Sequence, residues 1–347
     1  MKTMVNQFKL WDVAVRSAAA MLLVVGVCLP ALAVERTVIQ LNPGAGNREI
    51  QAALDHLPAA GGDVVLPAGT FEIRAPVVLR RDGLTLRGAG LESVLHLADN
   101  ANCPVIILGE PVNAPTQIIR HLTVAGFFVD GNRVHQNREL WRETGDGSEI
   151  RNNGITVQAV ADSVVENVTC ARCRSGGLVT TLGVRRLTVR GFEAFDNEFD
   201  GLACYLTEDS LFTGLNLHDN PGAGISLDLA FNHNIISNAV LSANDLGIFM
   251  RASHENKFFG VSIRNSRNHG VFMADTEDFT GGAVRTAPMT ECTQNAFTNL
   301  AAFNCGGAAF RVNSTTCTNN IIISPKFNAN GQGNLSQALP NLLLVVE

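Results

Sequence analysis

Three residues suited to acid–base chemistry recur at one spacing in the middle of the chain. Tyr205, Asp228 and Arg251 follow one another at intervals of 23 residues. Together, a phenol, a carboxylate and a guanidinium can neutralise a substrate carboxylate, remove a proton from the neighbouring carbon and protonate a leaving oxygen. The spacing predicts a catalytic row if the fold stacks these residues. A surface Asp–Arg pair beside a tyrosine is the structural alternative.

This spacing belongs to a longer repeat. A glycine followed by an apolar, a variable and an apolar residue returns at intervals of 23, 24, 23, 23, 23 and 37 residues, at Gly154, Gly177, Gly201, Gly224, Gly247, Gly270 and Gly307. Between the glycines, short runs of branched and aromatic residues alternate with turn residues. The pattern predicts an all-β fold, a right-handed parallel β-helix whose coils contain about 23 residues.

The repeat also predicts which side chains leave the core. Counting each glycine as position zero, positions one and three are apolar and face inward, so positions two and four face outward. Tyr205, Asp228 and Arg251 all occupy position four, and we expect adjacent members to lie about 5 Å apart. The asparagines near the coil ends are expected to form ladders through their side-chain amides, at Asn197, Asn220, Asn244 and Asn320.

Further polar and aromatic residues are candidate substrate contacts. His233, His254 and Asp275 lie close in sequence to the catalytic row. Two insertions interrupt the repeat, at residues 133–150 and 276–288, and long loops of a solenoid often gather on its binding face. Trp141 in the first insertion is expected to stack on a sugar ring, the alternative being that it covers the edge of a coil.

The cysteines indicate structural roles. Cys292 and Cys317 have similar neighbours and are 25 residues apart, about one coil, so a disulfide between them is predicted. The pair Cys170 and Cys173 is expected to pack in a coil, because no second ligand pair follows for zinc. The remaining cysteines of the mature chain are expected to lie inside the solenoid, at Cys103, Cys204 and Cys305. No metal site is predicted from the cysteines or histidines.

The ends of the chain predict export. Residues 1–33 carry basic residues, an apolar run and an A-x-A cleavage motif, as in a signal peptide. We expect residues 34–347 to form a single domain that is secreted or periplasmic and has no membrane span. The chain carries −6 and the signal +2, from three bases and one acid, so the mature protein carries −8. This charge argues against a nucleic-acid partner.

Near the mature N-terminus, an amphipathic segment at residues 47–57 predicts a helix that caps the open end of the solenoid. The Val-Val-Leu-Pro-Ala-Gly-Thr-Phe run, residues 64–71, follows it. This combination resembles the opening of pectate-lyase-like β-helix proteins. The resemblance implies a carbohydrate-related role, in a superfamily that contains lyases, hydrolases, epimerases, tailspikes and proteins without known activity.

Two subfamilies can be compared by motif. Residues 199–247 resemble the coils of mannuronan C5-epimerases, but Val179–Leu182 stands where that family has Asp-Pro-His. The resemblance therefore covers the scaffold and transfers no catalytic residue. The polygalacturonase motifs are absent, apart from a partial match at residues 268–270. Hydrolysis by Asp228 and Asp275, two coils apart, nevertheless fits the carboxylate separation of an inverting site.

The sequence as a whole predicts an exported protein that binds and modifies an acidic polysaccharide, with lyase-type cleavage as the first choice. The alternatives are a non-catalytic carbohydrate-binding or structural surface protein, and a glycoside hydrolase. Because the mature chain is acidic, an anionic substrate requires local bases or a bridging cation. The sequence assigns no definite cofactor; Ca²⁺ held by Asp228 is the cation it allows. The oligomeric state is left open.

Overall fold

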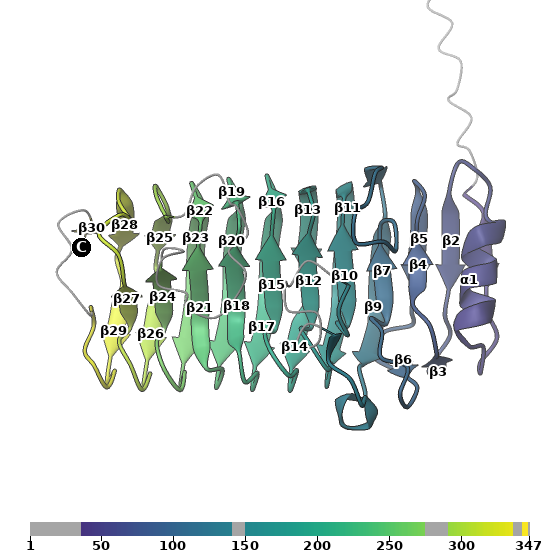
Figure 1. Ribbon diagram of the computed structural model, residues 1–347, viewed down its shortest axis with the longest axis horizontal. Helices are drawn as coiled ribbons and strands as arrows, with labels where there is room; N and C mark the ends of the chain where they lie inside the picture. The colour runs from purple at the N-terminus through teal and green to yellow at the C-terminus, as the bar shows by residue number, and fades with distance from the viewer. Residues whose placement is uncertain (1–35, 141–149, 275–290, 336–341, 346–347) are drawn as a thin grey trace, which may run out of the picture. The chain divides into compact units, whose positions relative to one another are not determined.

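The strands wind into coils that stack along one axis (Figure 1). The computed structural model describes residues 36–140, 150–274, 291–335 and 342–345. Strands of successive coils pair in parallel, as the repeat predicted, for example β10 with β12 and β17 with β20. The described strands form two sheets, of nine and 21 strands. Because each coil stacks on the one before it, side chains at equivalent positions come to lie side by side.

The nine-stranded sheet contains the glycine-led strands of the repeat. Its members are β4 Val77–Leu79, β7 Ile106–Leu108, β10 Ile155–Gln158, β12 Leu178–Thr181, β15 Leu202–Tyr205, β18 Ala223–Asp228, β21 Leu246–Arg251, β24 Val271–Ala274 and β27 Phe310–Val312. The sheet begins two coils before the first repeat glycine, because β4 and β7 pair with each other and β7 pairs with β10.

The 21-stranded sheet forms the rest of the wall. Its members are β1 Val38–Gln40, β2 Gly62–Val65, β3 Gly69–Ile73, β5 Leu84–Arg87, β6 Ser93–Leu97, β8 Ile119–Arg120, β9 Thr123–Asp130, β11 Val160–Ala171, β13 Val184–Arg190, β14 Glu193–Phe195, β16 Thr207–Glu208, β17 Leu211–His218, β19 Phe231–Asn232, β20 Ile235–Ser242, β22 Ser253–His254, β23 Lys257–Arg264, β25 Ala296–Thr298, β26 Ala301–Phe303, β28 Asn320–Ile323, β29 Lys326–Asn328 and β30 Leu342–Val345. A short 3-10 helix, η1 Arg133–His135, follows β9.

The strand register confirms the repeat except at its last member. Val271 pairs with Phe310, so position zero of the last coil is Ala309 and not Gly307. The interval from Gly270 is therefore 39 residues instead of 37. Gly307 has a different role: a Cβ there would lie 2.3 Å from Nδ1 of His269. The shift moves Arg311 from position four to position two.

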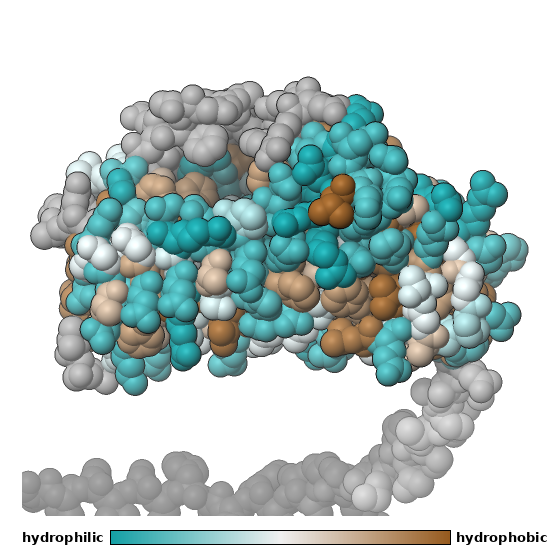
Figure 2. Space-filling view, turned by 90° about the horizontal axis from the view of Figure 1, so that it is seen from below, coloured by the Kyte–Doolittle hydropathy of each residue, from teal (hydrophilic) through white to brown (hydrophobic). Residues whose placement is uncertain are grey.

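Positions one and three of the repeat supply the core. Ile155, Leu202, Ile225 and Met250 are fully buried. Aromatic rings add to it, with Phe258 and Phe297 stacked at a centroid distance of 4.3 Å. The face shown in Figure 2 is mainly hydrophilic, with scattered hydrophobic residues. The solenoid therefore keeps its apolar side chains inside through the alternation of each strand.

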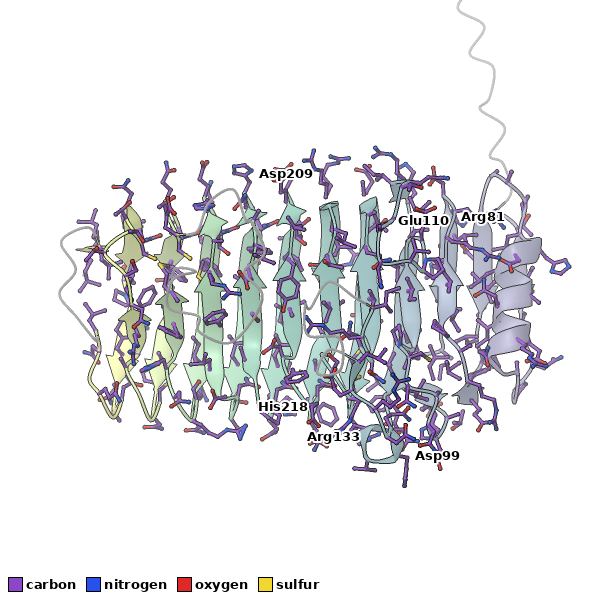
Figure 3. The ribbon with its side chains drawn as sticks, viewed as in Figure 1. Arg81, Asp99, Glu110, Arg133, Asp209 and His218 are labelled. Carbon is purple, nitrogen blue, oxygen red and sulfur yellow. The ribbon has the colours of Figure 1, made fainter. Side chains whose placement is uncertain are left out.

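The predicted capping helix is α1, Asn47–His56, at the N-terminal end of the solenoid (Figure 1). It buries Ile50, Ala53 and Leu54. Arg81 (Figure 3) secures its C-terminal end by donating to the carbonyls of Leu54, Leu57 and Pro58 at 2.6–2.8 Å. Such bonds satisfy carbonyls that a helix end leaves without partners. Among the described residues, no helix is long and apolar enough to cross a bilayer.

Two buried asparagine ladders run along the solenoid, which confirms the predicted role of these residues. One comprises Asn197, Asn220 and Asn244, and the second comprises Asn234, Asn256, Asn295 and Asn320. Each side-chain amide donates to a backbone carbonyl, and each except the last in its ladder also donates to the next asparagine. In this way the buried polar groups of the turns acquire partners.

Replacing Asn256 with alanine is expected to lower the free energy of unfolding by about 2–3 kcal/mol, because it leaves buried groups unsatisfied. Asn256 donates to the Phe231 carbonyl at 2.8 Å and accepts from the Asn234 backbone N–H at 3.0 Å. Denaturant unfolding measures the change. Asn216→Ala, at an exposed asparagine, is the control, with an expected change within about 0.5 kcal/mol. Equal losses in the two variants would contradict the ladder's role.

Candidate functional site

The structure brings Tyr205, Asp228 and Arg251 together. Tyr205 and Asp228 are direct strand partners on β15 and β18. Arg251, at the end of β21, donates from Nε to Oδ1 of Asp228 at 2.9 Å and from a terminal nitrogen to Oδ2. The three side chains therefore form a continuous row across three adjacent strands, which we call the central row.

The Asp228–Arg251 pair is buried. The Asp228 side chain is 5% exposed and that of Arg251 is 14% exposed. Asp228 Oδ1 also accepts the Leu229 backbone N–H at 2.7 Å. Burial works against the charge of Arg251, but the hydrogen bonds and charge of Asp228 outweigh it and raise the Arg251 pKa. The guanidinium is therefore always protonated, so it can neutralise a substrate carboxylate and cannot act as a base.

Within the row, Tyr205 is the partly exposed group that can transfer a proton, since the Asp228 carboxylate is buried and bonded to Arg251. The phenol of Tyr205 accepts or donates a proton, depending on its ionisation. The side chain is partly exposed and lies close enough to Arg251 to influence the pKa of the guanidinium. The row thus combines a fixed positive charge, the carboxylate that orients it and a proton-transfer group. This combination suits chemistry at a carbon next to a carboxylate.

Next to the row lies a cluster that the sequence did not identify as a site. Phe249, Phe272 and Arg311 are partners on β21, β24 and β27. The two rings are 5.7 Å apart, and the Arg311 guanidinium lies 5.3 Å from the centre of Phe272. His269 joins them, with its Nε2 atom 3.0 Å from a terminal nitrogen of Arg311. With Gly307 as position zero, Arg311 falls at position four and out of line with Phe249 and Phe272. The sequence pattern therefore does not reveal the cluster, which depends on the pairing of Phe272 with Arg311.

Of the two predicted histidine contacts, His254 lies on the 21-stranded sheet and His233 follows its strand β19. His233 is about half exposed and lies 3.8 Å from Asp209 and 3.7 Å from Glu255. Figure 3 places Asp209 at the margin of the coils. His254, on β22, is buried and its Nδ1 contacts Thr293 Oγ1 at 2.9 Å. Burial lowers the His254 pKa. The substrate-binding roles of both histidines remain predictions.

Other predicted residues and segments lie outside the described residues. They are the signal peptide, Trp141, Asp275 and the insertion at residues 276–288. The disulfide also remains a prediction. Cys292 and Cys317 lie in contact, with the backbone N–H of Cys292 donating to Sγ of Cys317 at 3.5 Å. Cys170 and Cys173 are fully buried, as expected for coil cysteines.

The outward positions are less accessible than the alternation predicts. Thr156 and Gln158 on β10 are 2% and 1% exposed. Gln158 donates to the carbonyl of Val112 at 2.7 Å, so the segment after β7 covers this strand. Accessible substrate contacts are therefore confined to later strands, where Tyr205, Phe249 and Phe272 are only partly buried.

A hollow of about 520 Å³ lies elsewhere, on the 21-stranded sheet. Leu91, Phe192 and Glu193 are among the residues that line it. Glu193 already accepts from Asn216 at 2.7 Å and from Thr169 at 3.2 Å. Both carboxylate oxygens of Glu193 are therefore already hydrogen-bonded within the sheet. The hollow lies on a different sheet from the central row.

Asp200 provides a test by pH, because burial raises its pKa to about 6. Its Oδ1 accepts the Ala223 backbone N–H at 2.7 Å. An unfolded aspartate titrates near ~3.9, so the folded state holds the proton more tightly. The stabilisation that protonated Asp200 contributes is present below pH ~4. It is lost as the pH rises to about 6.

Asp200→Asn is therefore expected to remove that decline. Denaturant unfolding at a series of pH values should show wild-type stability falling between ~4 and 6 and a flatter curve for the variant. The exposed Asp209→Asn variant is the control and should keep the wild-type curve. A wild-type curve that rises through this interval, with the same rise in the variant, would refute the assignment.

The sequence comparison identifies the family. The family model described as "Periplasmic copper-binding protein (NosD)" matches residues 127–335, which is 209 of 347 residues. The chain belongs to the NosD family. The match includes the central row and the cluster around Arg311.

Relatives of this NosD-family chain extend the comparison. Mannuronan C5-epimerase AlgE4 from Azotobacter vinelandii is 27% identical over 192 residues, covering 51% of this chain. The chain spans about a third of the length of that relative, 32%. This match confirms the predicted resemblance to epimerase coils.

Solved structures agree on the fold. The alginate lyase from Paenibacillus sp. str. FPU-7 has a TM-score of 0.63 at 11% identity, with 88% of this chain and 99% of that chain covered. Polygalacturonase from Erwinia carotovora ssp. carotovora has a TM-score of 0.59 at 12% identity, covering 89% and 99%. The NosD-family chain has the right-handed parallel β-helix fold of these structures.

The described residues do not fit a copper site of the kind the family's description implies. Among them, no three His, Cys, Asp or Glu side chains come close enough to hold a metal ion. The thiols are also unsuitable ligands: burial raises the pKa of Cys170 and Cys173, and that of Cys204 to about 12. Metal binding by cysteine requires the thiolate. We therefore assign no step of the chemistry to copper.

Proposed function

We propose that this NosD-family protein is exported and modifies a uronan on the outer face of its nine-stranded sheet. The observation that carries the proposal is the central row, in which a partly exposed Tyr205 lies beside the buried Arg251–Asp228 pair. The first reaction we expect is lyase-type elimination. It begins with removal of the proton at C5, the carbon that bears the uronate carboxylate.

The residues of the row divide the proposed reaction between them. Arg251 neutralises the uronate carboxylate, which makes the C5 proton more acidic. Asp228 holds the guanidinium in place through both of its oxygens. Tyr205, as the phenolate, takes the C5 proton. The electron pair forms the C4–C5 double bond, the C4–O bond breaks, and the leaving oxygen receives the proton from Tyr205.

The relatives support the choice of substrate class. They are named mannuronan epimerase, alginate lyase and polygalacturonase, which are enzymes of acidic polysaccharides. Epimerisation and elimination share the removal of the C5 proton. They differ in the fate of the electron pair left at C5, which takes up a proton in epimerisation and expels the C4 oxygen in elimination. The family description "periplasmic" and the predicted signal peptide support export.

The proposal is tested by incubating the mature protein with a panel of uronans and neutral glycans, with and without Ca²⁺. Three signals are read together: ultraviolet absorbance of unsaturated uronide, new reducing ends and the ratio of C5 epimers. Absorbance rising with reducing ends would support a lyase, and a change in epimer ratio alone would support the same proton transfer without cleavage. The Ca²⁺ arm tests whether a cation bridges the substrate to Asp228.

Other results would favour the remaining alternatives. Reducing ends without absorbance would indicate a hydrolase and direct attention to Asp228 and Asp275. Silence across the panel, together with binding of a uronan, would favour a non-catalytic carbohydrate-binding or structural protein. The locked Asp228–Arg251 pair is the observation that favours this second candidate, since an ion pair can stabilise a coil without any substrate.

A further inference from the structure

His269 and Arg311 present two N–H donors to each other with no acceptor between them. The buried backbone N–H of Ala308 donates to Nδ1 of His269 at 2.9 Å. Nδ1 therefore carries the lone pair, and the proton of the neutral ring lies on Nε2. Nε2 is 3.0 Å from a terminal nitrogen of Arg311, which is itself a donor.

The opposite tautomer of His269 would replace the donor–donor contact with Arg311 by a more costly one with the backbone N–H of Ala308. Were the proton on Nδ1, it would face the N–H of Ala308, a residue that is 0% exposed. A buried backbone donor without an acceptor costs more than a partly exposed arginine without one. Burial and the charge of Arg311 both lower the His269 pKa, which keeps the ring neutral.

The charge of Arg311 is not neutralised within the described residues. None of their carboxylates lies within ion-pair distance of it. Its Nε and one terminal nitrogen instead donate to the amide oxygen of Asn313, at 3.2 and 3.1 Å. In contrast, Arg251 on the same sheet is neutralised by Asp228.

The cluster is also preorganised. The Arg311 guanidinium lies over the Phe272 ring, and Asn313 fixes its plane. Gly307 leaves space for the imidazole, since a Cβ there would lie 2.3 Å from Nδ1. Two converging donors, one of them charged, on a rigid apolar floor are a binding site for an oxygen anion.

We infer that His269 and Arg311 bind a uronate carboxylate as a second substrate subsite, two strands beyond Arg251. The choice of ligand rests on the proposed function. Carboxylate oxygens placed between Nε2 of His269 and the Arg311 guanidinium accept from both, which removes the donor–donor contact. The subsite lies roughly 10 Å along the solenoid from Arg251, so one uronan chain spans both guanidinium groups.

The test is nuclear magnetic resonance of the full chain labelled in histidine, with oligoglucuronate as the probe. The Nε2 signal of His269 is expected to shift on binding. Acetate, glucose and the methyl ester of the oligomer are the comparison ligands; the neutral two should leave the signal unchanged, and acetate should bind more weakly than the oligomer. Acetate binding as tightly as the oligomer would overturn the assignment to a uronate.

Variants separate the charge from the fold. Arg311→Gln keeps the size of the side chain and is expected to weaken oligoglucuronate binding by about 10- to 100-fold. Arg264→Gln, at an exposed arginine on β23, is the matched control and should bind as the wild type does. The wild-type His269 signal requires no variant, so the inference remains testable if Arg311→Gln does not fold. An unshifted His269 at saturation would overturn it.

The inference and the proposed function can fail separately. Uronan modification with an unchanged KM in Arg311→Gln would overturn the subsite and leave the function standing. A His269 shift with oligoglucuronate, in a protein that modifies no uronan, would support the subsite and reject the function.

Discussion

Replacing Tyr205 with phenylalanine is expected to reduce the rate of uronan modification by about 10²–10⁴-fold. The variant removes only the hydroxyl group, and with it the proton transfer assigned to this residue. The ring stays in place on β15 beside Asp228. The rate at saturating substrate should therefore fall while oligouronate affinity stays close to that of the wild type.

The free energy of unfolding of Tyr205→Phe serves as the control, because it shows whether the variant keeps its fold. Tyr205 is only partly buried, so the free energy of unfolding of the variant should lie within about 0.5 kcal/mol of the wild-type value. A variant that folds normally and keeps the wild-type rate would remove Tyr205 from the mechanism. Proton transfer would then need another group near Arg251.

Replacing Arg251 with alanine is expected to destabilise the fold by about 3–5 kcal/mol, because it leaves Asp228 buried without its counter-charge. The Asp228 side chain is 5% exposed. Denaturant unfolding measures the loss. The double variant Asp228→Asn with Arg251→Ala should recover part of it, since the uncompensated charge is gone.

A surface ion pair provides the matched control for this second prediction. Arg190 and Glu166 are 2.8 Å apart, with side chains 53% and 30% exposed. Arg190→Ala is expected to cost about 0–1 kcal/mol. Equal costs for Arg251→Ala and Arg190→Ala would show that burial of the central pair carries no energetic weight.

The sequence predicted the solenoid because stacking imposes the same chemistry on every coil. Each position one or three must be apolar, and each buried turn must supply an amide, so the period is visible in a single chain. The glycine motif does not extend to the early coils, because Pro76 and Val105 stand where later coils have glycine, as the pairing of β4, β7 and β10 shows. The predicted register of the last coil was wrong because Gly307 matches the glycine motif. This glycine instead leaves space for the His269 ring.

The central row was predictable for the same reason, since equal spacing in a solenoid produces contact. Its energetics were not predictable, because the burial of Asp228 and the two-point geometry of Arg251 depend on packing. The pairing of His269 with Arg311 joins residues 42 apart and depends on the true register of β27. Likewise, the cover over Gln158 comes from a segment 46 residues away.

The central claim is that the row removes the C5 proton of a uronan, and it is tested most directly with a substrate labelled with deuterium at C5. Release of the label into water reports proton removal, whether elimination or epimerisation comes next. The account predicts release by the wild type and about 10²–10⁴-fold slower release by Tyr205→Phe. A uronan that binds and keeps its label, or equal release by the two proteins, would contradict it.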